Sequence, residues 1–233
     1  MARIFAITFA REGSKGIKGK NIKHMNGKPL LAYSIDLAKK IPTVHDIFVS
    51  TDGTEIAEIA REYGAEVIIR PAELASDCAN EWDAWQHAIK YLKANFGMHD
   101  DDLLLSLPCT SPLRSLPDIN KLIEEFKDSS SDLALCITES ARNPYFNMVN
   151  ADNSGIVNLV CDAGKFHRRQ DVPKVYDITT VGYLTTARFI SSANGVLSGK
   201  TLGVVVPRAS SIDIDEQLDF DFAELLLKKQ EQI

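Results

Sequence analysis

Short apolar runs alternate with amphipathic stretches along most of the chain. In the amphipathic stretches, apolar residues recur every three or four positions, which places them on one face of a helix. Residues 29–40 show this pattern, with Leu31, Ile35 and Ala38 on a shared face. We predict helices over residues 29–40, 54–63, 80–95, 117–126, 186–194 and 216–230. The apolar runs predict strands over residues 4–9, 46–51, 65–69, 103–107, 133–138, 181–184 and 202–206.

The order of these elements predicts the fold class. Strands that are apolar on both faces and separated by helices are typical of a parallel sheet with helices on each side. We therefore predict an α/β fold with a doubly wound, mostly parallel sheet. Within it, Asp52 is a candidate N-cap with Glu55 three residues later, and Gly64 closes the helix that they open.

The alternation breaks after Thr138 and resumes near residue 181. Residues 140–180 hold short apolar stretches separated by turn-forming segments, such as Asn143-Pro144 and residues 152–155. We predict that this segment leaves the main sheet as a hairpin arm. The chain has no internal repeat and no low-complexity linker, so residues 1–233 are predicted to form a single domain with this arm.

Composition is that of an ordinary globular protein. Of the 233 residues, 45% are hydrophobic and 25% are charged. No apolar run approaches the about 20 residues that cross a bilayer, and the N-terminus leads straight into a strand, so we expect neither a membrane span nor a signal peptide. The cysteines Cys78, Cys109, Cys136 and Cys161 are far apart, which favours buried thiols of a cytoplasmic protein over a zinc site.

Positive charge is concentrated in one segment. The net charge of −6 argues against a nucleic-acid-binding protein. Residues 11–28, however, hold six basic residues and a single acidic one, Glu12. A concentrated basic loop suits a small polyanion such as a nucleoside triphosphate. The alternative is a lysine-rich face that contacts only solvent.

This basic loop follows the first predicted strand, and open parallel sheets bind their ligands beyond the carboxyl ends of strands. Its glycines allow backbone N–H groups to approach an anion closely, and its basic side chains can neutralise phosphate charge. The residues concerned are Gly13, Gly16 and Gly19, with Arg11, Lys15 and Lys20. Spacing excludes two well-known phosphate loops. A dinucleotide fingerprint has Gly-x-Gly-x-x-Gly, whereas two residues separate successive glycines here; a P-loop continues with Lys-Ser/Thr, whereas Lys20 precedes Asn21.

A second candidate for chemistry is the segment 211–215, Ser-Ile-Asp-Ile-Asp. In an extended chain, residues two apart point to the same side, so Asp213 and Asp215 present paired carboxylates. Paired carboxylates suit the magnesium ion that accompanies a nucleotide. The alternative is that Asp215 is the N-cap of the last helix, where the helix dipole favours an anion.

Six segments, in order along the chain, carry a family resemblance. The first is residues 10–21, which read Ala-Arg-x-Gly-Ser-Lys-Gly-Ile-x-x-Lys-Asn. The others are Ser50-Thr51-Asp52, Arg70-Pro-Ala-Glu-Leu-Ala75, Thr110-Ser-Pro-Leu-Arg114, Arg168-Arg-Gln-Asp171 with Pro173, and Ile212-Asp-Ile-Asp215. Together they resemble the motifs of the CMP-sialic acid synthetase (acylneuraminate cytidylyltransferase) family, and the resemblance covers essentially the whole chain.

The resemblance implies a Rossmann-like nucleotidyltransferase fold and a reaction in which CTP and an acidic α-keto sugar give a CMP-sugar and pyrophosphate. It also implies Mg²⁺ held by Asp213 and Asp215, and a homodimer that exchanges the arm. The implied catalytic residues are Arg11, Lys20 and Asp215. The implied nucleotide-binding residues are Ala10, Arg11, Gly13, Ser14, Lys15, Lys20, Asn21, Arg70 and Asn80. The implied sugar-binding residues are Ser111, Arg168, Arg169, Gln170 and Tyr183.

The sequence departs from the family's motifs on the sugar side. Many members have Gln-Pro before Thr-Ser-Pro-Leu-Arg, where this chain has Pro108-Cys109. Many also have Asn-Gly-Ala-Ile-Tyr, where residues 179–183 read Thr-Thr-Val-Gly-Tyr. The acceptor therefore stays open among N-acetylneuraminic, legionaminic, pseudaminic and other keto-sugar acids. Alternatives to this function are a CMP-Kdo-type synthetase and a catalytically idle nucleotide-binding module.

Overall fold

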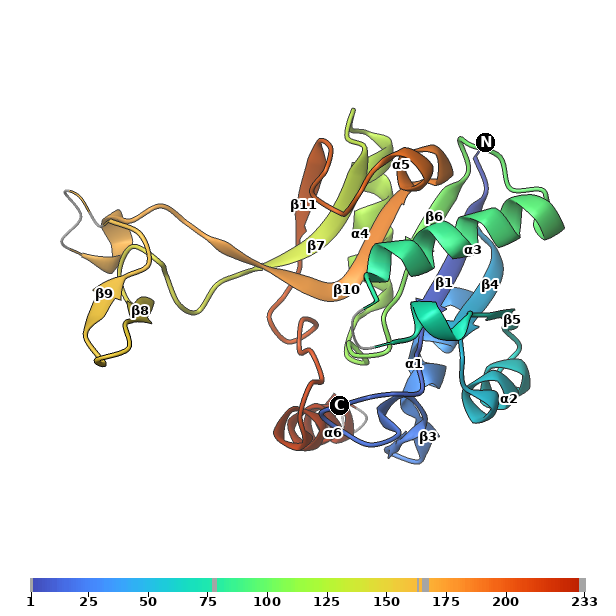
Figure 1. Cartoon of the computed structure of the whole chain (residues 1–233), viewed down its shortest axis with the longest axis horizontal. Helices are drawn as coiled ribbons and strands as arrows, with labels where there is room; N and C mark the ends of the chain where they lie inside the picture. The colour runs from blue at the N-terminus through green and yellow to red at the C-terminus, as the bar shows by residue number, and fades with distance from the viewer. Residues whose placement is uncertain (1, 77–78, 163, 165–167, 231–233) are drawn as a thin grey trace.

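The computed structural model describes residues 2–76, 79–162, 164 and 168–230 (Figure 1). Its centre is a seven-stranded sheet in the order β11-β7-β10-β6-β1-β4-β5. The strands are β1 Ile4–Phe9, β4 Val44–Thr51, β5 Glu66–Ile69, β6 Leu103–Ser106, β7 Leu133–Glu139, β10 Tyr176–Thr186 and β11 Thr201–Val205. Neighbouring strands are parallel except where β10 runs antiparallel to β6 and β7. The predicted mostly parallel sheet is confirmed.

Helices cover both faces of this sheet (Figure 1). Successive side chains of β1 point to opposite faces, as in any strand. Ile4 and Ala6 join the cluster that contains α1 and α4, whereas Phe5 and Ile7 join the cluster that contains α3 and α5. The helices are α1 Leu30–Lys39, α2 Thr54–Glu62, α3 Glu81–Phe96, α4 Leu116–Lys127, α5 Ala187–Ser192 and α6 Gln217–Gln230. Shorter elements are η1 Lys20–Ile22, η2 Ala72–Leu74, η3 Arg169–Asp171, β2 His24–Met25 and β3 Lys28–Pro29.

The start of α2 differs from the sequence prediction. Asp52 is not its N-cap, because the cap position is Gly53, which has no side chain that could cap the helix. The Asp52 carboxylate instead accepts a hydrogen bond from the backbone N–H of Glu12, at 3.0 Å. The Asp52 carboxylate oxygen that the local sequence predicted to cap α2 therefore binds the loop after β1 instead. Gly64 does follow the helix in the left-handed conformation, with φ of 71°.

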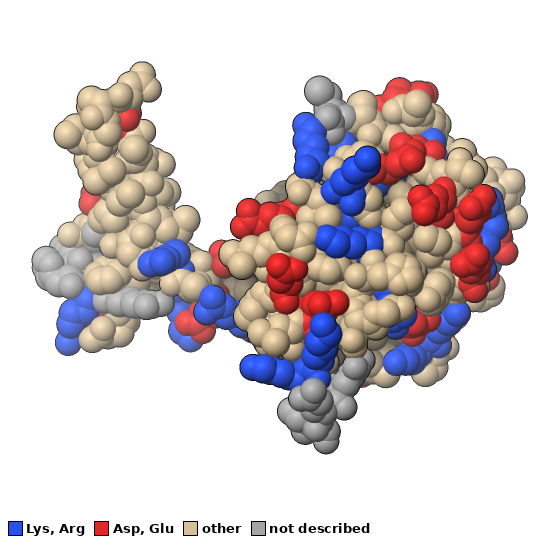
Figure 2. Space-filling view, turned by 90° about the horizontal axis from the view of Figure 1, so that it is seen from below, with Lys and Arg blue, Asp and Glu red and all other residues tan. Residues whose placement is uncertain are grey.

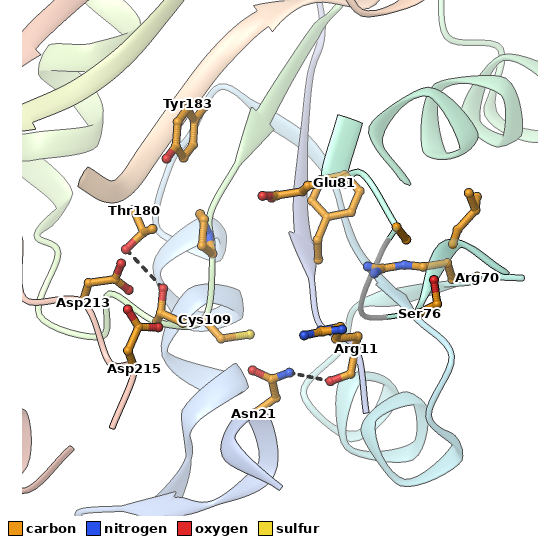
Figure 3. Close-up of a pocket in the computed structure, with 15 residues that line it drawn as sticks. Arg11, Asn21, Arg70, Ser76, Glu81, Cys109, Thr180, Tyr183, Asp213 and Asp215 are labelled. Carbon is orange, nitrogen blue, oxygen red and sulfur yellow. Dashed lines mark hydrogen bonds between the residues drawn. The ribbon is translucent and has the colours of Figure 1, made fainter. Parts of the chain in front are cut away.

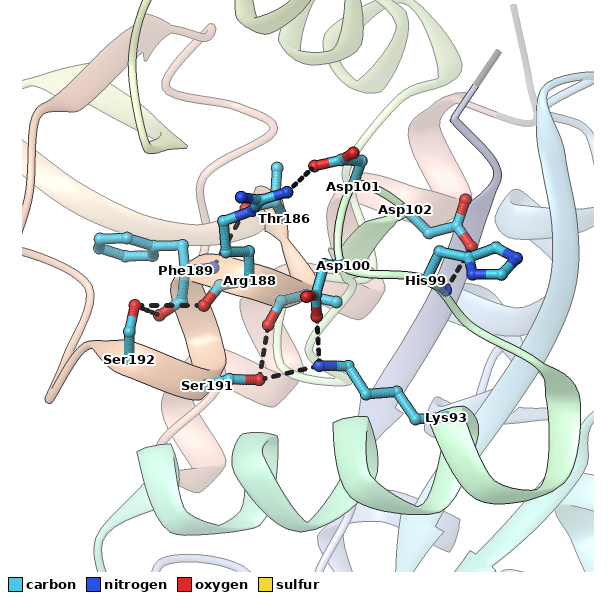
Figure 4. Close-up of polar contacts among 11 residues, drawn as sticks. Lys93, His99, Asp100, Asp101, Asp102, Thr186, Arg188, Phe189, Ser191 and Ser192 are labelled. Atoms are coloured by element: carbon cyan, nitrogen blue, oxygen red, sulfur yellow. Dashed lines mark hydrogen bonds and ion pairs between the residues drawn. The ribbon is translucent and has the colours of Figure 1, made fainter.

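Polar contacts gather around the segment before β6, at the amino ends of the parallel strands (Figure 4). Asp102, directly before β6, accepts a hydrogen bond from the Arg3 guanidinium at 2.7 Å and another from the backbone N–H of His99 at 2.9 Å. Two exposed pairs lie beside it, Lys93–Asp100 and Arg188–Asp101, each at 2.6 Å. These contacts join β1, β6, α3 and α5 at the end of the sheet opposite the carboxyl ends of the parallel strands.

Between β7 and β10 the chain leaves the sheet as an arm (Figure 1). The arm carries a small hairpin of β8 Val149–Ala151 and β9 Val157–Leu159. Its outer part has few charged side chains (Figure 2). Exposed apolar side chains there are Phe146, Met148, Val149, Ile156, Val157 and Val160. The organisation as one domain and the role of the arm in a dimer stay predictions.

The thiols and the helices give two further observations. Cys109 and Cys136 are buried, Cys161 is half-buried, and all three are free; Cys78 lies outside the described residues. No helix in the described part of the chain is long and apolar enough to span a membrane.

Candidate active site

A cavity of about 350 Å³ opens at the carboxyl ends of the parallel strands (Figure 3). Open α/β sheets bind their ligands at this edge. Its walls come from the loop after β1, the segment after β5, the start of α3, the loop after β6, the middle of β10 and the segment before α6. Among the residues implied by the resemblance, it is lined by Arg11, Asn21, Arg70, Tyr183, Asp213 and Asp215.

The basic loop after β1 folds back on itself beside the cavity. Asn21, buried in η1, donates a hydrogen bond from Nδ2 to the Arg11 carbonyl oxygen at 2.9 Å. Gly16 lies so close to the segment before α6 that a Cβ on it would be 1.9 Å from the Asp215 carbonyl oxygen. Only glycine permits this approach of two backbones.

Lys20 ties the same loop to the segment before α6. Its Nζ donates a hydrogen bond to the Ile214 carbonyl oxygen at 2.6 Å and lies 3.5 Å from Asp215 Oδ1. The Ile214 N–H in turn donates to the Thr110 carbonyl oxygen at 2.9 Å. Ile214 is fully buried, while the residues on either side of it line the cavity, as the extended pattern predicts.

Asp213 and Asp215 form one wall of the cavity (Figure 3). Asp213 Oδ1 is buried and has no hydrogen-bond partner among the described residues. A buried carboxylate oxygen is unfavourable unless something binds it, so this atom fits a cation ligand. No group of three or more His, Cys, Asp or Glu side chains in the described part of the chain could hold a metal ion. The other ligands of a Mg²⁺ ion here would therefore be oxygens of the substrate or of water.

The alternative role of Asp215 as the N-cap of α6 is wrong. The helix begins at Gln217, and the capping oxygen belongs to Asp219. Asp219 Oδ2 accepts hydrogen bonds from the N–H groups of Asp215 at 3.0 Å and Glu216 at 2.9 Å. The Asp215 carboxylate is thus not used by the helix and faces the cavity.

Arg11 and Arg70 lie across the cavity from the two aspartates (Figure 3). Arg70 is buried and donates a hydrogen bond from Nη2 to the Ser50 carbonyl oxygen at 2.8 Å. Burial lowers the pKa of Arg70, and the nearby carboxylates partly oppose that shift. A polyanion bound between these walls can meet arginines on one side and a carboxylate-bound cation on the other.

Hydroxyl groups line the β10 side of the cavity. Tyr183 is on this wall, and burial raises the pKa of its phenol, which therefore stays neutral. Thr180 Oγ1 is 2.7 Å from Ser111 Oγ and accepts a hydrogen bond from Thr110 Oγ1 at 3.1 Å. Ser111 is fully buried and does not line the cavity, so the hydroxyl that reaches a ligand from this pair is that of Thr180.

Arg114 has a structural part in the site that sequence reasoning missed. It is buried and donates to Ser34 Oγ at 3.2 Å, to the Thr180 carbonyl oxygen at 3.3 Å and to the Pro108 carbonyl oxygen. Burial lowers its pKa to about 10. Arg114 thereby joins the loop after β6 to β10 and holds the wall that contains Pro108 and Thr180. Its place at the end of the Thr-Ser-Pro-Leu-Arg motif was the only signal for it.

Several residues implied to bind nucleotide lie beside the cavity rather than on its wall. Ala10 is buried, and its N–H donates to the Ser50 carbonyl oxygen at 3.0 Å. Asn80 caps α3, since its Oδ1 accepts from the Trp82 N–H at 3.0 Å. Lys20 faces the backbone of the segment before α6, as described above. Further along the basic loop, Gly13, Ser14 and Lys15 do not line the cavity either.

The residues implied to bind sugar from the arm are not brought to this cavity within one chain. Arg168 and Gln170 are exposed on the arm, and Arg168 pairs with Asp171 at 2.8 Å. Arg169 belongs to η3, and its side chain lies outside the described part of the structure.

Two further wall residues, Glu81 and Cys109, were not assigned a role from the sequence. Glu81 is in the first turn of α3, where acidic residues occur simply because the helix dipole favours them, so the sequence held no signal for it. Burial raises the pKa of the Cys109 thiol to about 12, so the thiol is neutral.

Comparisons with known proteins place the chain among others by sequence and by fold. The sequence model of the cytidylyltransferase family matches residues 5–226. The post-translational flagellin modification protein B of Campylobacter coli is 36% identical over 99% of this chain and 97% of its own length. The CMP-N,N'-diacetyllegionaminic acid synthase of Campylobacter jejuni is 35% identical over 97% of this chain and 96% of its own length. A solved structure of CMP:2-keto-3-deoxy-manno-octonic acid synthetase complexed with CTP shares the fold, with a TM-score of 0.70 at 14% identity over 98% of this chain and 100% of that one. The chain therefore belongs to the cytidylyltransferase family and is a nucleotidyltransferase, as its motifs implied.

Proposed function

We propose that this protein transfers the cytidylyl group of CTP to the anomeric hydroxyl of an acidic nonulosonic keto-sugar, which gives a CMP-sugar and pyrophosphate. One observation carries the proposal: Asp213 and Asp215 face Arg11 and Arg70 across the cavity, and Asp213 Oδ1 has no hydrogen-bond partner in the part of the chain that the structure describes. The acceptor class is supported by the name of the Campylobacter jejuni relative, which makes a CMP-linked legionaminic acid.

On the nucleotide side, Arg11 and Lys20 contact the triphosphate, and Arg70 lies near the cytosine base. Lys20 reaches a phosphate by exchanging its hydrogen bond with the Ile214 carbonyl for a phosphate oxygen. Asn21 contributes from the cavity wall. The family resemblance assigns further nucleotide contacts to Ala10, Gly13, Ser14, Lys15 and Asn80, which lie beside the cavity in this structure.

In the reaction, the anomeric oxygen attacks the α-phosphorus in line with the departing pyrophosphate. The new phosphorus–oxygen bond forms as the bond to the bridging oxygen breaks, and the hydroxyl proton passes to solvent. Arg11 and Lys20 offset the negative charge that builds up on the phosphoryl oxygens. Mg²⁺, when held by Asp213 and Asp215, supplies further charge neutralisation at the same phosphates.

On the sugar side, Tyr183 lines the β10 wall, and Ser111 lies behind that wall, where its hydroxyl contacts Thr180. The arm supplies Arg168, Arg169 and Gln170 to the cavity of a second subunit. The arm extends away from its own cavity (Figure 1), and its exposed apolar side chains suit an interface. We propose a homodimer of single-domain chains that works in the cytoplasm. Light scattering tests the dimer, because a clean monomer of 25.8 kDa contradicts it.

Pyrophosphate release tests the reaction. The protein is incubated with Mg²⁺, each nucleoside triphosphate, and N-acetylneuraminic, legionaminic, pseudaminic or Kdo acceptors. We expect release only with CTP and a nonulosonic acid; release with UTP or GTP alone contradicts the cytidylyl assignment, and release with Kdo alone contradicts the acceptor class. Asp215→Ala is expected to abolish turnover with an unchanged fold by circular dichroism, while Asp221→Ala, on the exposed face of α6, retains it.

A further inference from the structure

We propose that Glu81 selects the base of the nucleotide: its carboxylate accepts a hydrogen bond from the exocyclic amino group of cytosine and disfavours uracil. This inference rests on the proposed function, because it assigns the base-binding wall of the same cavity.

The position of Glu81 suits this role. Glu81 is the first residue of α3, and its side chain points into the cavity on the side away from Asp213 and Asp215 (Figure 3). Its Oε1 is 3.4 Å from Trp85 Nε1, which steadies the carboxylate from within the helix. Among the described residues, Oε2 has no hydrogen-bond partner, so it is available to a ligand.

The charges of the two substrates limit which of their groups can bind the Glu81 carboxylate. CTP carries its negative charge on the triphosphate, and the acceptor is itself an acid, so both repel an unneutralised carboxylate. Asp215 is beside Lys20, and the Asp213–Asp215 pair suits a cation, whereas Glu81 is on the other wall. Neutral donors that a carboxylate can meet are the amino group of the base, the hydroxyls of the ribose and the sugar, and the amide N–H groups of an N-acylated sugar. Among these, the amino group of the base fits the place of Glu81, because Arg70, which lies near the base in the proposed function, is close enough to interact with Glu81.

The neighbours of Glu81 match the edge of cytosine in particular. Cytosine presents an amino donor next to two acceptors, the ring nitrogen and the carbonyl oxygen. Glu81 is an acceptor, and the buried Arg70, which carries donors only, is close enough for their charges to interact. Uracil presents a carbonyl oxygen where cytosine has the amino group, and this oxygen would face the carboxylate. Phe9 and Leu74 supply apolar surface beside these groups for a planar ring.

Equilibrium binding tests the inference without an acceptor sugar. Isothermal titration calorimetry measures the dissociation constants of CTP, UTP, 2′-deoxy-CTP and the 2-pyrimidinone ribonucleoside triphosphate, which lacks the amino group. In the wild-type protein, we expect CTP to bind about ten- to one-hundred-fold more tightly than either UTP or the pyrimidinone nucleotide, the effect of one hydrogen bond to a charged group. In Glu81→Ala, CTP and the pyrimidinone nucleotide should bind equally. In Glu81→Gln, whose amide can also donate to a carbonyl, the preference for CTP over UTP should narrow at least tenfold.

Asp83→Asn is the matched control, because Asp83 shares the first turn of α3 and its helix dipole but does not line the cavity. This variant should keep the wild-type preference for CTP. An unchanged CTP preference in Glu81→Ala overturns the inference, as does a loss of affinity for CTP that is absent for 2′-deoxy-CTP, since the carboxylate would then bind the ribose. Failure of the wild-type protein to bind CTP contradicts the proposed function and the inference together, whereas CTP binding with the preference intact in Glu81→Ala contradicts only the inference.

Discussion

Replacing Gly16 with alanine probes the contact between the basic loop and the segment that carries the two aspartates. A Cβ at residue 16 would lie 1.9 Å from the Asp215 carbonyl oxygen and 3.1 Å from its carbonyl carbon. Both obstacles are backbone atoms, so no side-chain rotation relieves them. To reach even 3.0 Å, the short limit of real Cβ contacts, the two segments must separate by about 1.1 Å.

This displacement should affect catalysis more than stability. Overpacking costs about 1–3 kcal/mol of unfolding free energy, and an exposed loop can relieve part of it by moving. A misplacement of about 1 Å in a group that positions substrate can lower the rate about 100-fold. Lys20 and Asp215 sit on the two segments that are forced apart. We therefore expect kcat/KM of Gly16→Ala to fall about 100-fold in a protein that is still folded.

The assay is steady-state pyrophosphate release with CTP and the acceptor that the substrate panel identifies, together with thermal unfolding. Gly195→Ala is the control, because the nearest atom to a Cβ there is Ser198 Oγ at 3.8 Å, an ordinary contact. It should behave like the wild-type protein. A wild-type kcat/KM in Gly16→Ala, or equal losses in both variants, would refute the argument from backbone proximity.

The remaining predictions concern Asp213, Arg114 and Asp102. Asp213→Asn should lower kcat about 10²–10³-fold without lowering the thermal midpoint, because its buried oxygen has no partner within the described residues to lose; a wild-type kcat contradicts a role in catalysis. Arg114→Met should lower the unfolding free energy, measured in urea, by about 1–3 kcal/mol for each carbonyl left without a donor, and an unchanged urea midpoint would show that these bonds contribute nothing. Burial raises the pKa of Asp102, but hydrogen bonds from Arg3 and neighbouring backbone outweigh it and hold the pKa below 3.8. A carboxyl group whose pKa is lower in the folded state than in the unfolded state stabilises the fold at pH values above its unfolded-state pKa. This stability is lost as the pH falls through the folded-state pKa. The midpoint of urea unfolding should therefore drop when the pH is lowered below 3.8. The drop should be smaller in Asp102→Asn.

The main sheet could be predicted because buried parallel strands need apolar residues on both faces. Ile4, Phe5 and Ile7 of β1 are nearly inaccessible to solvent, and their uninterrupted apolar run marks the strand. The predicted strand at β10 was too short because only the buried part of this strand has that apolar pattern. It covered residues 181–184, whereas the strand is Tyr176–Thr186. The first residues of β10 lead out to the arm and are exposed, so their sequence lacks the apolar pattern.

Contacts between distant segments could not be read from local patterns. Lys20 and Ile214 are 194 positions apart, so a hydrogen bond between them leaves no trace in spacing. Asp52 shows how a distant contact can defeat a local pattern. Its sequence context is typical of a helix N-cap, but its carboxylate accepts a hydrogen bond from the distant backbone N–H of Glu12. Glu81 could not be recognised as a cavity residue from the sequence, because the helix dipole alone accounts for an acidic residue in the first turn of a helix.

These limits bear differently on the proposed nucleotide half of the site and on the proposed sugar half, both of which stay predictions. Much of the proposed nucleotide half comes from one contiguous loop, and the closeness of Gly16 to the Asp215 backbone brings the carboxylate pair to this loop. The proposed sugar half combines β10, the loop held by Arg114 and an arm that points away from its own cavity. If the arm completes the cavity of a second chain, the acceptor is chosen by surfaces that meet only in the dimer. Substitutions on the arm should then change the preferred sugar without changing the affinity for CTP, which separates the two halves experimentally.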